Sequence, residues 1–280
     1  MIPRPEEVDL VIYHGGCTDG FGAAFAAWTV LGDRASYHPA KYREDPPDVS
    51  GKNVLIVDFS YPRDVLLRMR DSARSIIVLD HHKSAMEDLA GLDFAQFDMS
   101  CSGAMLSWSF FHPHEYPPDL IRYIQDRDLW QWRLHKSKEY SQGLSMVPFT
   151  FEDFNACTQG GATQRLIQRG EEIVKYIDLQ VERICDHAAP RQLRAAPHLK
   201  CLVVNTSQWI SEVGSRLCQD ADIAVMWHMD HNRDTWRISL RSRAGVDSTV
   251  VSRAYGGGGH PQASGFSLGP DDHIEGIFHE

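Results

Sequence analysis

The sequence lacks the features of a membrane or secreted protein. It has no run of about 18 apolar residues, the length that a helix needs to cross a bilayer. Residues 1–7 do not show the charged-then-apolar layout of a signal peptide. We therefore expect a cytoplasmic protein with no membrane partner. Its apolar content of 42% and charged content of 24% are ordinary for a globular protein.

The chain also lacks paired cysteines and an excess of basic residues. Its six cysteines are scattered, without a Cys-x-x-Cys pair, which predicts reduced thiols rather than a disulfide framework. Lys and Arg number 28 against 38 Asp and Glu, for a formal net charge of -10. This balance argues against a broad basic surface for long nucleic acid. A small anionic substrate is still allowed, because metal ions can supply local positive charge.

The first half of the chain alternates predicted strands and helices. Short β-branched runs predict buried strands, and alanine-rich or amphipathic stretches predict helices. In chain order the predicted elements are a strand at 8–13, a helix at 20–28, a strand at 53–57, a helix at 65–69, a strand at 75–79 and helices at 102–111 and 121–132. This alternation indicates parallel strands covered by helices.

The second half begins with one long predicted helix. Apolar residues recur at helical spacing from Thr163 to about His187, and Pro190 follows. The later predicted elements are strands at 199–204, 223–228 and 235–240 and helices at 212–217 and 250–254. The long helix therefore separates two groups of strands.

These patterns predict an α/β protein of two domains. A parallel-sheet domain is expected at 1–155, a connector helix at 156–190 and a smaller α/β domain at 191–280.

Metal-capable side chains follow the predicted strands of the first half. They are His14, Asp19, Asp58, Asp80, His81 and His82, together with Asp126 in a later helical segment. Because the carboxyl ends of parallel strands meet at one edge of a sheet, we expect these residues to converge. Carboxylates and imidazoles suit Mn²⁺ and similar divalent ions. Two such ions can clamp the attacking and leaving oxygens of a phosphoryl transfer.

Taken singly, each of these residues has an ordinary explanation. A His-His pair is more often a surface feature than a pair of ligands, and His14 before two glycines suits a turn. Asp126 and Asp128 suit solvated helix charges paired with Arg122 and Arg127. The joint pattern favours a metal site, because four independent coincidences would otherwise be needed.

Two motifs together resemble those of the DHH phosphoesterase superfamily. Asp80-His81-His82 follows a hydrophobic strand, and Asp58 stands in a Val-Asp-Phe segment. Gly256–Phe266, which reads Gly-Gly-Gly-Gly-His-Pro-Gln-Ala-Ser-Gly-Phe, is similar to the signature of the DHHA1 C-terminal domain. The two motifs in this order are specific together, and the chain resembles the oligoribonuclease-like and dinucleotide phosphodiesterase-like members of the superfamily. The similarity extends over nearly the whole chain.

The resemblance implies a two-domain hydrolase of phosphodiester or phosphoanhydride bonds. By this resemblance residues 1–155 form the metal-binding catalytic DHH domain and residues 191–280 form a DHHA1-like domain that binds substrate. It also implies two divalent cations, most readily Mn²⁺ and otherwise Mg²⁺. By the same resemblance Asp58 bridges both metals, and Asp19 and His81 bind metal. Asp126 corresponds to the last metal-binding aspartate, with Asp128 as a less favoured substitute.

The other two residues of the triplet receive catalytic roles from the resemblance. His82 faces the scissile phosphate or lies behind a ligand, and Asp80 orients an imidazole. A water between the metals would lose its proton and attack phosphorus in line with the leaving oxygen. This mechanism is a hypothesis, and it makes Asp58 indispensable.

The first motif departs from the pattern of common members of the superfamily. They carry three alternating aspartates, or a histidine followed by aspartates four and six positions later. Here Cys17 stands three positions after His14, and Asp19 stands five after it. A thiolate is a soft ligand that suits Zn²⁺ better than Mn²⁺. We expect His14 to complete the first metal's ligands and Cys17 not to bind metal.

The glycine-rich motif indicates anion binding. Four glycines alone would suit a plain turn, but His260 follows them and Arg241 and Arg243 lie near a predicted strand end. Glycines let backbone N–H groups approach an anion closely. By resemblance, the residues that hold a phosphate or terminal nucleotide are Arg241, Gly257, Gly258, Gly259 and His260.

Acidic charge and modest length favour short substrates. We expect a phosphodiesterase, or nuclease, that converts short oligonucleotides or linear or cyclic dinucleotides to mononucleotides. The alternatives are a phosphatase on adenosine bisphosphate or polyphosphate and a non-catalytic nucleotide-binding sensor. Trp130, Trp132 and Tyr255 suit base stacking, but at helical spacing such residues more often belong to the core. A homodimer is left open.

Overall fold

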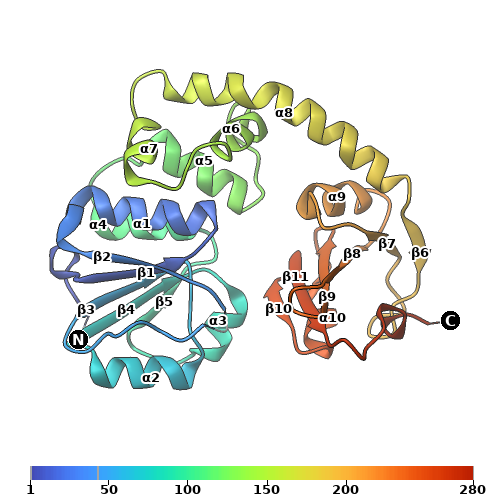
Figure 1. The fold of residues 1–280 in the computed structure, drawn as a ribbon, viewed down its shortest axis with the longest axis horizontal. Coiled ribbons are helices and arrows are strands. Elements are labelled where there is room, and N and C mark those ends of the chain that lie inside the picture. The colour runs from blue at the N-terminus through green and yellow to red at the C-terminus, as the bar shows by residue number, and fades with distance from the viewer. Residues whose placement is uncertain (1, 43, 280) are drawn as a thin grey trace. The chain divides into compact units, whose positions relative to one another are not determined.

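The computed structural model describes residues 2–42 and 44–279. The chain divides into two compact units, residues 1–174 and 175–280. Each unit is built on its own β-sheet (Figure 1).

The first unit contains a five-stranded sheet in the order β2-β1-β3-β4-β5, and all of its pairings are parallel. The strands are β1 (Leu10–His14), β2 (Ser36–Ala40), β3 (Asn53–Val57), β4 (Ser75–Asp80) and β5 (Ala95–Phe97). Helices lie between β1 and β2, between β3 and β4 and between β4 and β5, as is usual for connections between parallel strands. This topology brings the carboxyl ends of all five strands to one edge.

The central strands are apolar on both faces because helices cover both faces. In β3, Leu55 and Val57 belong to one core cluster, whereas Val54 and Ile56 belong to another. Side chains alternate in this way along any strand. The two layers of helix are α1 (Thr18–Leu31) with α4 (Gly103–Phe111) on one face and α2 (Arg63–Ser72) on the other (Figure 1).

Shorter helices extend the core on the α1 side. They include α5 (Asp119–Asp128), α6 (Ser137–Leu144) and α7 (Phe151–Ala156), while α3 (Lys83–Asp88) follows β4. Tyr140 and Phe154 are fully buried there, and Phe154 packs edge-on against Phe21 with centroids 4.7 Å apart. α8 (Ala162–Cys185) is a single helix that runs from the first unit into the second.

The second unit holds a six-stranded sheet in the order β10-β11-β9-β8-β7-β6. β7 and β8 pair in parallel, and the other neighbours pair antiparallel. Its elements are β6 (Ala189–Arg191), β7 (Cys201–Asn205), α9 (Ile210–Leu217), β8 (Ile223–Asp230), β9 (Thr235–Ser242), α10 (Thr249–Ala254), β10 (Gly258–His260) and β11 (Ala263–Leu268). One-turn 3-10 helices lie at Pro5–Glu7, Gly32–Arg34 and Ile274–Ile277.

The predicted fold class is confirmed, since a parallel α/β unit precedes a smaller α/β unit. The sequence analysis did not find β2, whose half-exposed positions and Pro39 suit an edge strand rather than a buried one. The predicted domain limits of 1–155, 156–190 and 191–280 remain a proposal. Within residues 2–42 and 44–279, no helix has both the length and the apolar character that a membrane crossing requires.

Candidate metal centre

The carboxyl ends of three neighbouring strands bring the first candidate residues together. β1 pairs with β3 and β3 pairs with β4, so His14, Asp58 and Asp80 stand at adjacent strand ends. Asp58 donates its N–H to the Leu79 carbonyl at 3.0 Å and then leaves the sheet with a φ of 55°. Aspartate tolerates this left-handed conformation better than most residues. The sheet topology therefore creates the convergence that the sequence predicted.

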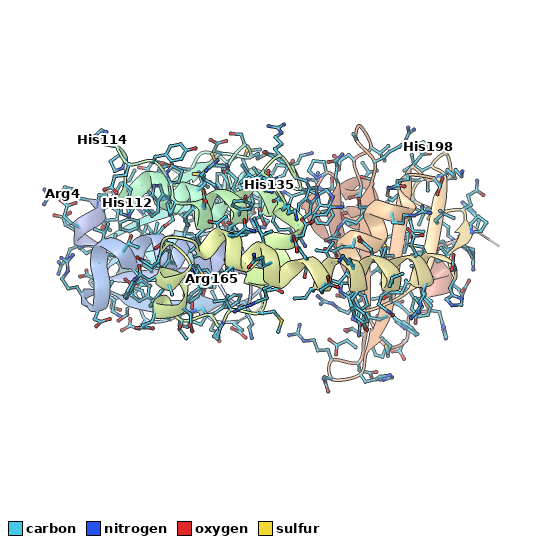
Figure 2. All side chains as sticks on the ribbon, turned by 90° about the horizontal axis from the view of Figure 1, so that it is seen from above. Arg4, His112, His114, His135, Arg165 and His198 are labelled. Atoms are coloured by element: carbon cyan, nitrogen blue, oxygen red, sulfur yellow. The ribbon has the colours of Figure 1, made fainter. Side chains whose placement is uncertain are left out.

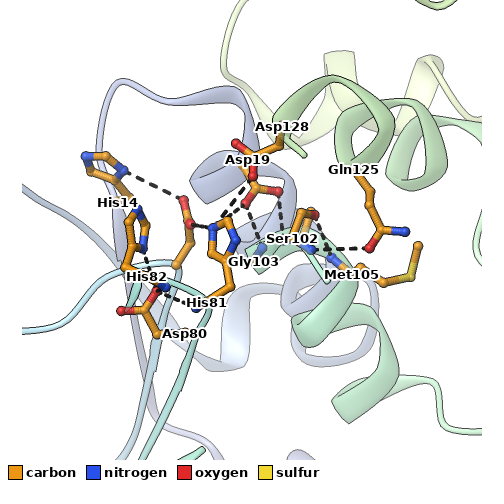
Figure 3. A network of polar contacts seen from close by, with 12 residues as sticks. His14, Asp19, Asp80, His81, His82, Ser102, Gly103, Met105, Gln125 and Asp128 are labelled. Atoms are coloured by element: carbon orange, nitrogen blue, oxygen red, sulfur yellow. Dashed lines mark hydrogen bonds and ion pairs between the residues drawn. The ribbon is translucent and has the colours of Figure 1, made fainter. Parts of the chain in front are cut away.

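His81 lies among three carboxylates (Figure 3). Its Nε2 is 3.1 Å from Asp58 Oδ1, 3.6 Å from Asp128 Oδ2 and 3.7 Å from Asp19 Oδ2. Asp19, Asp58 and His81 are buried, and the Asp128 side chain is 29% exposed. We call these four residues the acidic cluster. One imidazole cannot balance three ionised carboxylates.

The start of α4 fixes Asp19, which belongs to the first turn of α1. Gly103 and Ala104 donate their backbone N–H groups to Asp19 Oδ2 and Oδ1, at 2.6 and 3.0 Å. The first N–H groups of a helix lack partners within it, and the positive end of the helix dipole attracts a carboxylate. Asp19 is thereby held in place by a helix that begins 84 residues later.

The environment perturbs every ionisable group of the acidic cluster. Burial and the Asp58 carboxylate raise the pKa of Asp19 well above its ordinary value, and burial also raises the pKa of Asp128. Burial opposes ionisation of Asp58, but contacts with His14 and His81 hold its pKa below the ordinary value. Burial likewise opposes charge on His81, yet its carboxylate neighbours raise its pKa to about 9. A cation binding here would displace protons.

The acidic cluster fits a divalent cation. Asp58 Oδ2 is buried and accepts no hydrogen bond from the described residues. His14 Nδ1 lies 3.7 Å from this oxygen, which is beyond hydrogen-bond reach. A buried carboxylate oxygen without a partner is costly, and a cation would supply that partner. Oxygen and imidazole donors are the ligands that Mn²⁺ and Mg²⁺ sites use.

Asp80 forms hydrogen bonds with both His81 and His82. Its Oδ1 accepts hydrogen bonds from His82 Nδ1 and from the His81 backbone N–H, both at 2.7 Å, and its Oδ2 accepts from Ser60 Oγ at 2.6 Å. Burial opposes its ionisation, but hydrogen bonds from His82 and Ser60 keep the pKa of Asp80 below the ordinary value. An ionised carboxylate only accepts, so His82 carries a hydrogen on Nδ1. This is the geometry of a carboxylate that orients an imidazole.

The structure does not bring Asp126 into the acidic cluster. Its Oδ1 and Oδ2 accept hydrogen bonds from the backbone N–H groups of Arg133 and Leu134, at 2.9 and 3.2 Å. Both carboxylate oxygens thus hold the segment that follows α5. Asp128, which the sequence analysis ranked second, is the residue of this pair that reaches His81.

His14 and Cys17 form a second small group with Asp58. The three residues each offer a ligand atom, and these atoms lie within 4.8 Å of one another. Cys17 is the N-cap residue of α1. Burial and the carboxylates Asp58 and Asp19 raise the pKa of Cys17 far above its ordinary value. In the absence of a cation it is therefore a neutral thiol.

In the second unit, the candidate residues His260 and Arg241 lie at the same level across neighbouring strands of the sheet. Ala263 of β11 pairs with His260 of β10 on one side and with Arg241 of β9 on the other. Directly paired residues project from the same face of a sheet, so His260 and Arg241 share a face. The Arg241 guanidinium donates to Ser211 Oγ at 2.9 Å, which fixes it beside α9.

The glycines beside His260 have a packing role. A Cβ at Gly257 would lie 2.1 Å from the Gly265 carbonyl oxygen, and Gly259 has a φ of 133°. Gly257 is therefore required for the close approach of the two strands, and Gly259 for its backbone angle. Anion binding by Gly257, Gly258 and Gly259 stays a prediction.

Other histidines lie outside these groups. Figure 2 labels His112, His114 and His135 in the first unit and His198 in the second. Within the part of the chain that the structure describes, none of the four belongs to a group of three or more metal-capable side chains. His112 instead stacks on Trp108, with ring centroids 4.0 Å apart.

Residues 204–279 match the DHHA1 domain. Protein R106 of Acanthamoeba polyphaga mimivirus is 28% identical over 286 residues, which cover 94% of this chain and 68% of R106. Oligoribonuclease NrnB of Bacillus subtilis is 23% identical over 222 residues, which cover 68% of this chain and only about half, 52%, of NrnB. The chain is therefore similar to proteins of the DHH/DHHA1 superfamily, and the family match itself lies in the second unit.

Two solved structures share the fold over nearly the whole chain. The pGpG-specific phosphodiesterase PggH of Vibrio cholerae superposes with a TM-score of 0.54 at 13% identity, covering 95% of this chain and 94% of PggH. RecJ of Thermus thermophilus in complex with Mn²⁺ also gives 0.54, at 15% identity, covering 94% of this chain and 50% of RecJ. At these identities the similarity establishes the fold.

Gly103 is a residue of the candidate metal centre that the sequence analysis missed. It donates to Asp19, and a Cβ at this position would lie 2.3 Å from Asp58 Cβ. Only a glycine lets the start of α4 approach both carboxylates. The Ser102-Gly103 pair before an apolar helix signals a helix start, since serine is a preferred N-cap residue. This sequence signal does not show which side chain accepts hydrogen bonds from the backbone N–H groups at the helix start.

Gly103→Ala is expected to displace Asp58 and to weaken stabilisation by Mn²⁺. Overpacking of this kind costs about 1–3 kcal/mol of unfolding free energy, and the added methyl group would push apart the two carboxylates. Thermal unfolding with and without Mn²⁺ measures both effects. Gly160→Ala, at an exposed glycine with open space around its Cβ position, is the control. An unchanged response to Mn²⁺ in Gly103→Ala would show that the close approach is not needed.

Proposed function

We propose that this protein is a metal-dependent phosphodiesterase that hydrolyses short oligonucleotides or dinucleotides to mononucleotides. The acidic cluster carries the proposal: three carboxylates converge on His81 Nε2 within 3.7 Å at the carboxyl edge of a parallel sheet. Two bound Mn²⁺ ions, or Mg²⁺ in their place, would lower the pKa of a water and neutralise charge on the phosphoryl oxygens.

Different residues of the centre would bind the cations and orient the ligands. Asp19, Asp58, His81 and Asp128 would hold the cations, with His14 on the other side of Asp58. Asp58 would take the bridging position, because its two oxygens face His81 and His14 separately. The start of α4 keeps Asp19 oriented, so that the cluster needs little rearrangement when cations bind.

His82 would face the phosphate rather than a metal. Its hydrogen bond to Asp80 fixes the ring, and its ring centroid lies 4.7 Å from that of His81. Burial disfavours charge on His82, but the Asp80 carboxylate raises its pKa above the ordinary value. A histidine held in this way can stabilise negative charge that develops on a phosphoryl oxygen.

A cavity beside the acidic cluster supports a short substrate. It has a volume of about 260 Å³ and lies within the first unit, with Asp19 and Asp128 in its wall. Pockets for drug-sized ligands usually span about 300–1,000 Å³, so this one suits a single nucleoside unit rather than a long strand. Its polar lining includes Arg127, Ser141 and Gln142, which offer partners for a base or ribose.

The second unit and the relatives support the same substrate class. Arg241 and His260 project from one face of the second sheet and would bind a terminal phosphate. NrnB is named an oligoribonuclease, and PggH is described as specific for pGpG. Both names agree with a substrate of few nucleotides.

Chromatography of the products from a substrate panel tests the proposal. The panel contains a linear dinucleotide, a cyclic dinucleotide, a short oligoribonucleotide, a long single strand, adenosine bisphosphate and polyphosphate, each with Mn²⁺. Release of mononucleotides from the linear dinucleotide and the short oligoribonucleotide is expected, and a chelator should abolish it.

Two outcomes would overturn the proposal. Release of phosphate from adenosine bisphosphate or polyphosphate alone would identify a phosphatase. Tight binding of a dinucleotide in Mn²⁺ without any product would identify a nucleotide sensor.

A further inference from the structure

The two oxygens of Asp58 face two different groups of metal-capable side chains. Oδ1 lies 3.1 Å from His81 Nε2, within the acidic cluster. Oδ2 lies 3.7 Å from His14 Nδ1, and His14, Cys17 and Asp58 have ligand atoms within 4.8 Å of one another. The two groups therefore offer different donors. Aspartates surround the first, whereas the second contains a thiol.

The second group has an independent sign of a missing ligand. Asp58 is 2% exposed, and its Oδ2, the oxygen on the His14 side, accepts no hydrogen bond from the described residues. Such an oxygen needs a partner, and His14 is too distant to hydrogen-bond with it. A cation between Asp58, His14 and Cys17 would be that partner.

Helix capping does not explain the cysteine. Cys17 occupies the N-cap position of α1, but its side chain makes no capping hydrogen bond. Serine, threonine, aspartate or asparagine would cap the helix better, by about 1 kcal/mol relative to a residue that cannot cap. Gly16, with a φ of 76°, makes the turn before it. The position thus holds a thiol although local structure favours an oxygen.

We propose that Cys17 is a thiolate ligand of the first metal, together with His14 and Asp58. This inference rests on the metal centre of the proposed function and revises the expectation that Cys17 does not bind metal. Nitrogen, sulfur and oxygen donors favour Zn²⁺, Co²⁺ or Fe²⁺ over Mn²⁺ and Mg²⁺. The acidic cluster, with its oxygen and imidazole donors, suits Mn²⁺. On binding, the thiol releases its proton to solvent and forms a metal–sulfur bond, without oxidation or reduction.

Titration of the metal-free protein with Co²⁺ tests the ligand directly. A thiolate bound to Co²⁺ gives a charge-transfer absorption in the near ultraviolet, which imidazole and carboxylate ligands alone do not give. The wild-type protein should show this band, and Cys17→Ser should lose it while still binding Co²⁺. Cys101→Ser removes a partly exposed thiol that belongs to none of the metal-capable groups among the described residues, and it should keep the band. A wild-type protein without the band, or a Cys17→Ser variant that keeps it, overturns the proposal.

Affinity gives a second measure. Cys17→Ser should weaken Zn²⁺ binding at the first position by more than about 100-fold, since changes behind a ligand already cost about 10–100-fold. Cys17→Asp should shift the preference toward Mn²⁺. Equal Zn²⁺ affinity in all three proteins would contradict the assignment.

Alkylation of the wild-type protein keeps the test independent of variant folding. Zn²⁺ should protect Cys17 from iodoacetamide, as located by peptide mass, and should leave Cys101 reactive. Modification of Cys17 at the same rate with and without Zn²⁺ would overturn the proposal. These readouts do not depend on hydrolysis. An inactive protein with the charge-transfer band would refute the proposed function and keep the ligand, and an active protein without the band would do the reverse.

Discussion

Asp58→Asn is expected to lower the turnover number for a dinucleotide by at least about 10³-fold, since loss of one electrostatic stabiliser already costs about 10²–10³ in other enzymes. The carboxylate faces His81 with one oxygen and His14 with the other. An amide keeps this shape, but it has no negative charge and only one good acceptor. It therefore cannot hold a cation on each side.

Asparagine is the informative replacement because of the backbone at this position. Asp58 has a φ of 55°, which asparagine tolerates and alanine does not. Asp58→Ala would add strain of about 1–2 kcal/mol and would confuse a lost ligand with a weakened fold. In the metal-free state Asp58→Asn should be less stable than the wild type near neutral pH, because the lowered pKa of Asp58 means that the folded state favours its ionised carboxylate.

Kinetics and thermal unfolding check this prediction. At an Mn²⁺ concentration 100 times the Kd, binding stabilises the wild type by about 2.7 kcal/mol, and Asp58→Asn should gain much less. Asp64→Asn neutralises an exposed carboxylate on α2 and should preserve both turnover and the response to Mn²⁺. Retention of Mn²⁺-dependent hydrolysis by Asp58→Asn would remove Asp58 from the proposed centre.

The convergence of His14, Asp58 and Asp80 could be predicted from the sequence. Each follows a short β-branched run, and the alternation of strand and helix implies a parallel sheet. In such a sheet neighbouring strand ends share an edge, whatever the details of packing. The structure places these three residues on adjacent strands for that reason.

The contacts of Asp19 could not be predicted in the same way. Its partners are backbone N–H groups at the start of α4, and no side-chain pattern marks a backbone donor. The need for glycine at position 103 arises only when α4 approaches Asp58. Both features depend on how α1 and α4 pack on the sheet, which sequence periodicity does not determine.

The choice between Asp126 and Asp128 was also beyond the sequence. Residues two apart on a helix point in directions roughly 200° apart, so at most one of them can face the acidic cluster. Which one does so depends on the rotation of α5 about its axis, and tertiary packing sets that rotation. Apolar burial of Leu120, Ile121 and Ile124 fixes this rotation.

Asp128→Asn and Asp126→Asn are expected to affect different properties. Asp128 lies 3.6 Å from His81 Nε2, so its loss should weaken Mn²⁺ binding by more than about 100-fold, given that changes behind a ligand cost about 10–100-fold. Its removal relieves repulsion among carboxylates, and metal-free stability should not fall. Asp126→Asn should instead weaken the segment after α5. It replaces one of two acceptors by an N–H donor that faces a backbone N–H, at a cost of about 1–3 kcal/mol.

Titration calorimetry with Mn²⁺ and urea unfolding separate the two effects. Each variant serves as the control for the other, because both exchange a carboxylate for an amide on the same helix. The Mn²⁺ affinity of Asp126→Asn should stay within about tenfold of the wild-type affinity, which is roughly 1.4 kcal/mol of binding free energy. The same variant should unfold at a lower urea concentration than the wild type. If Asp126→Asn stays folded and loses Mn²⁺, while Asp128→Asn keeps both properties, then Asp126 is the ligand and α5 must rotate when cations bind. Asp126 would then take the place of Asp128 among the proposed ligands, as the sequence predicts.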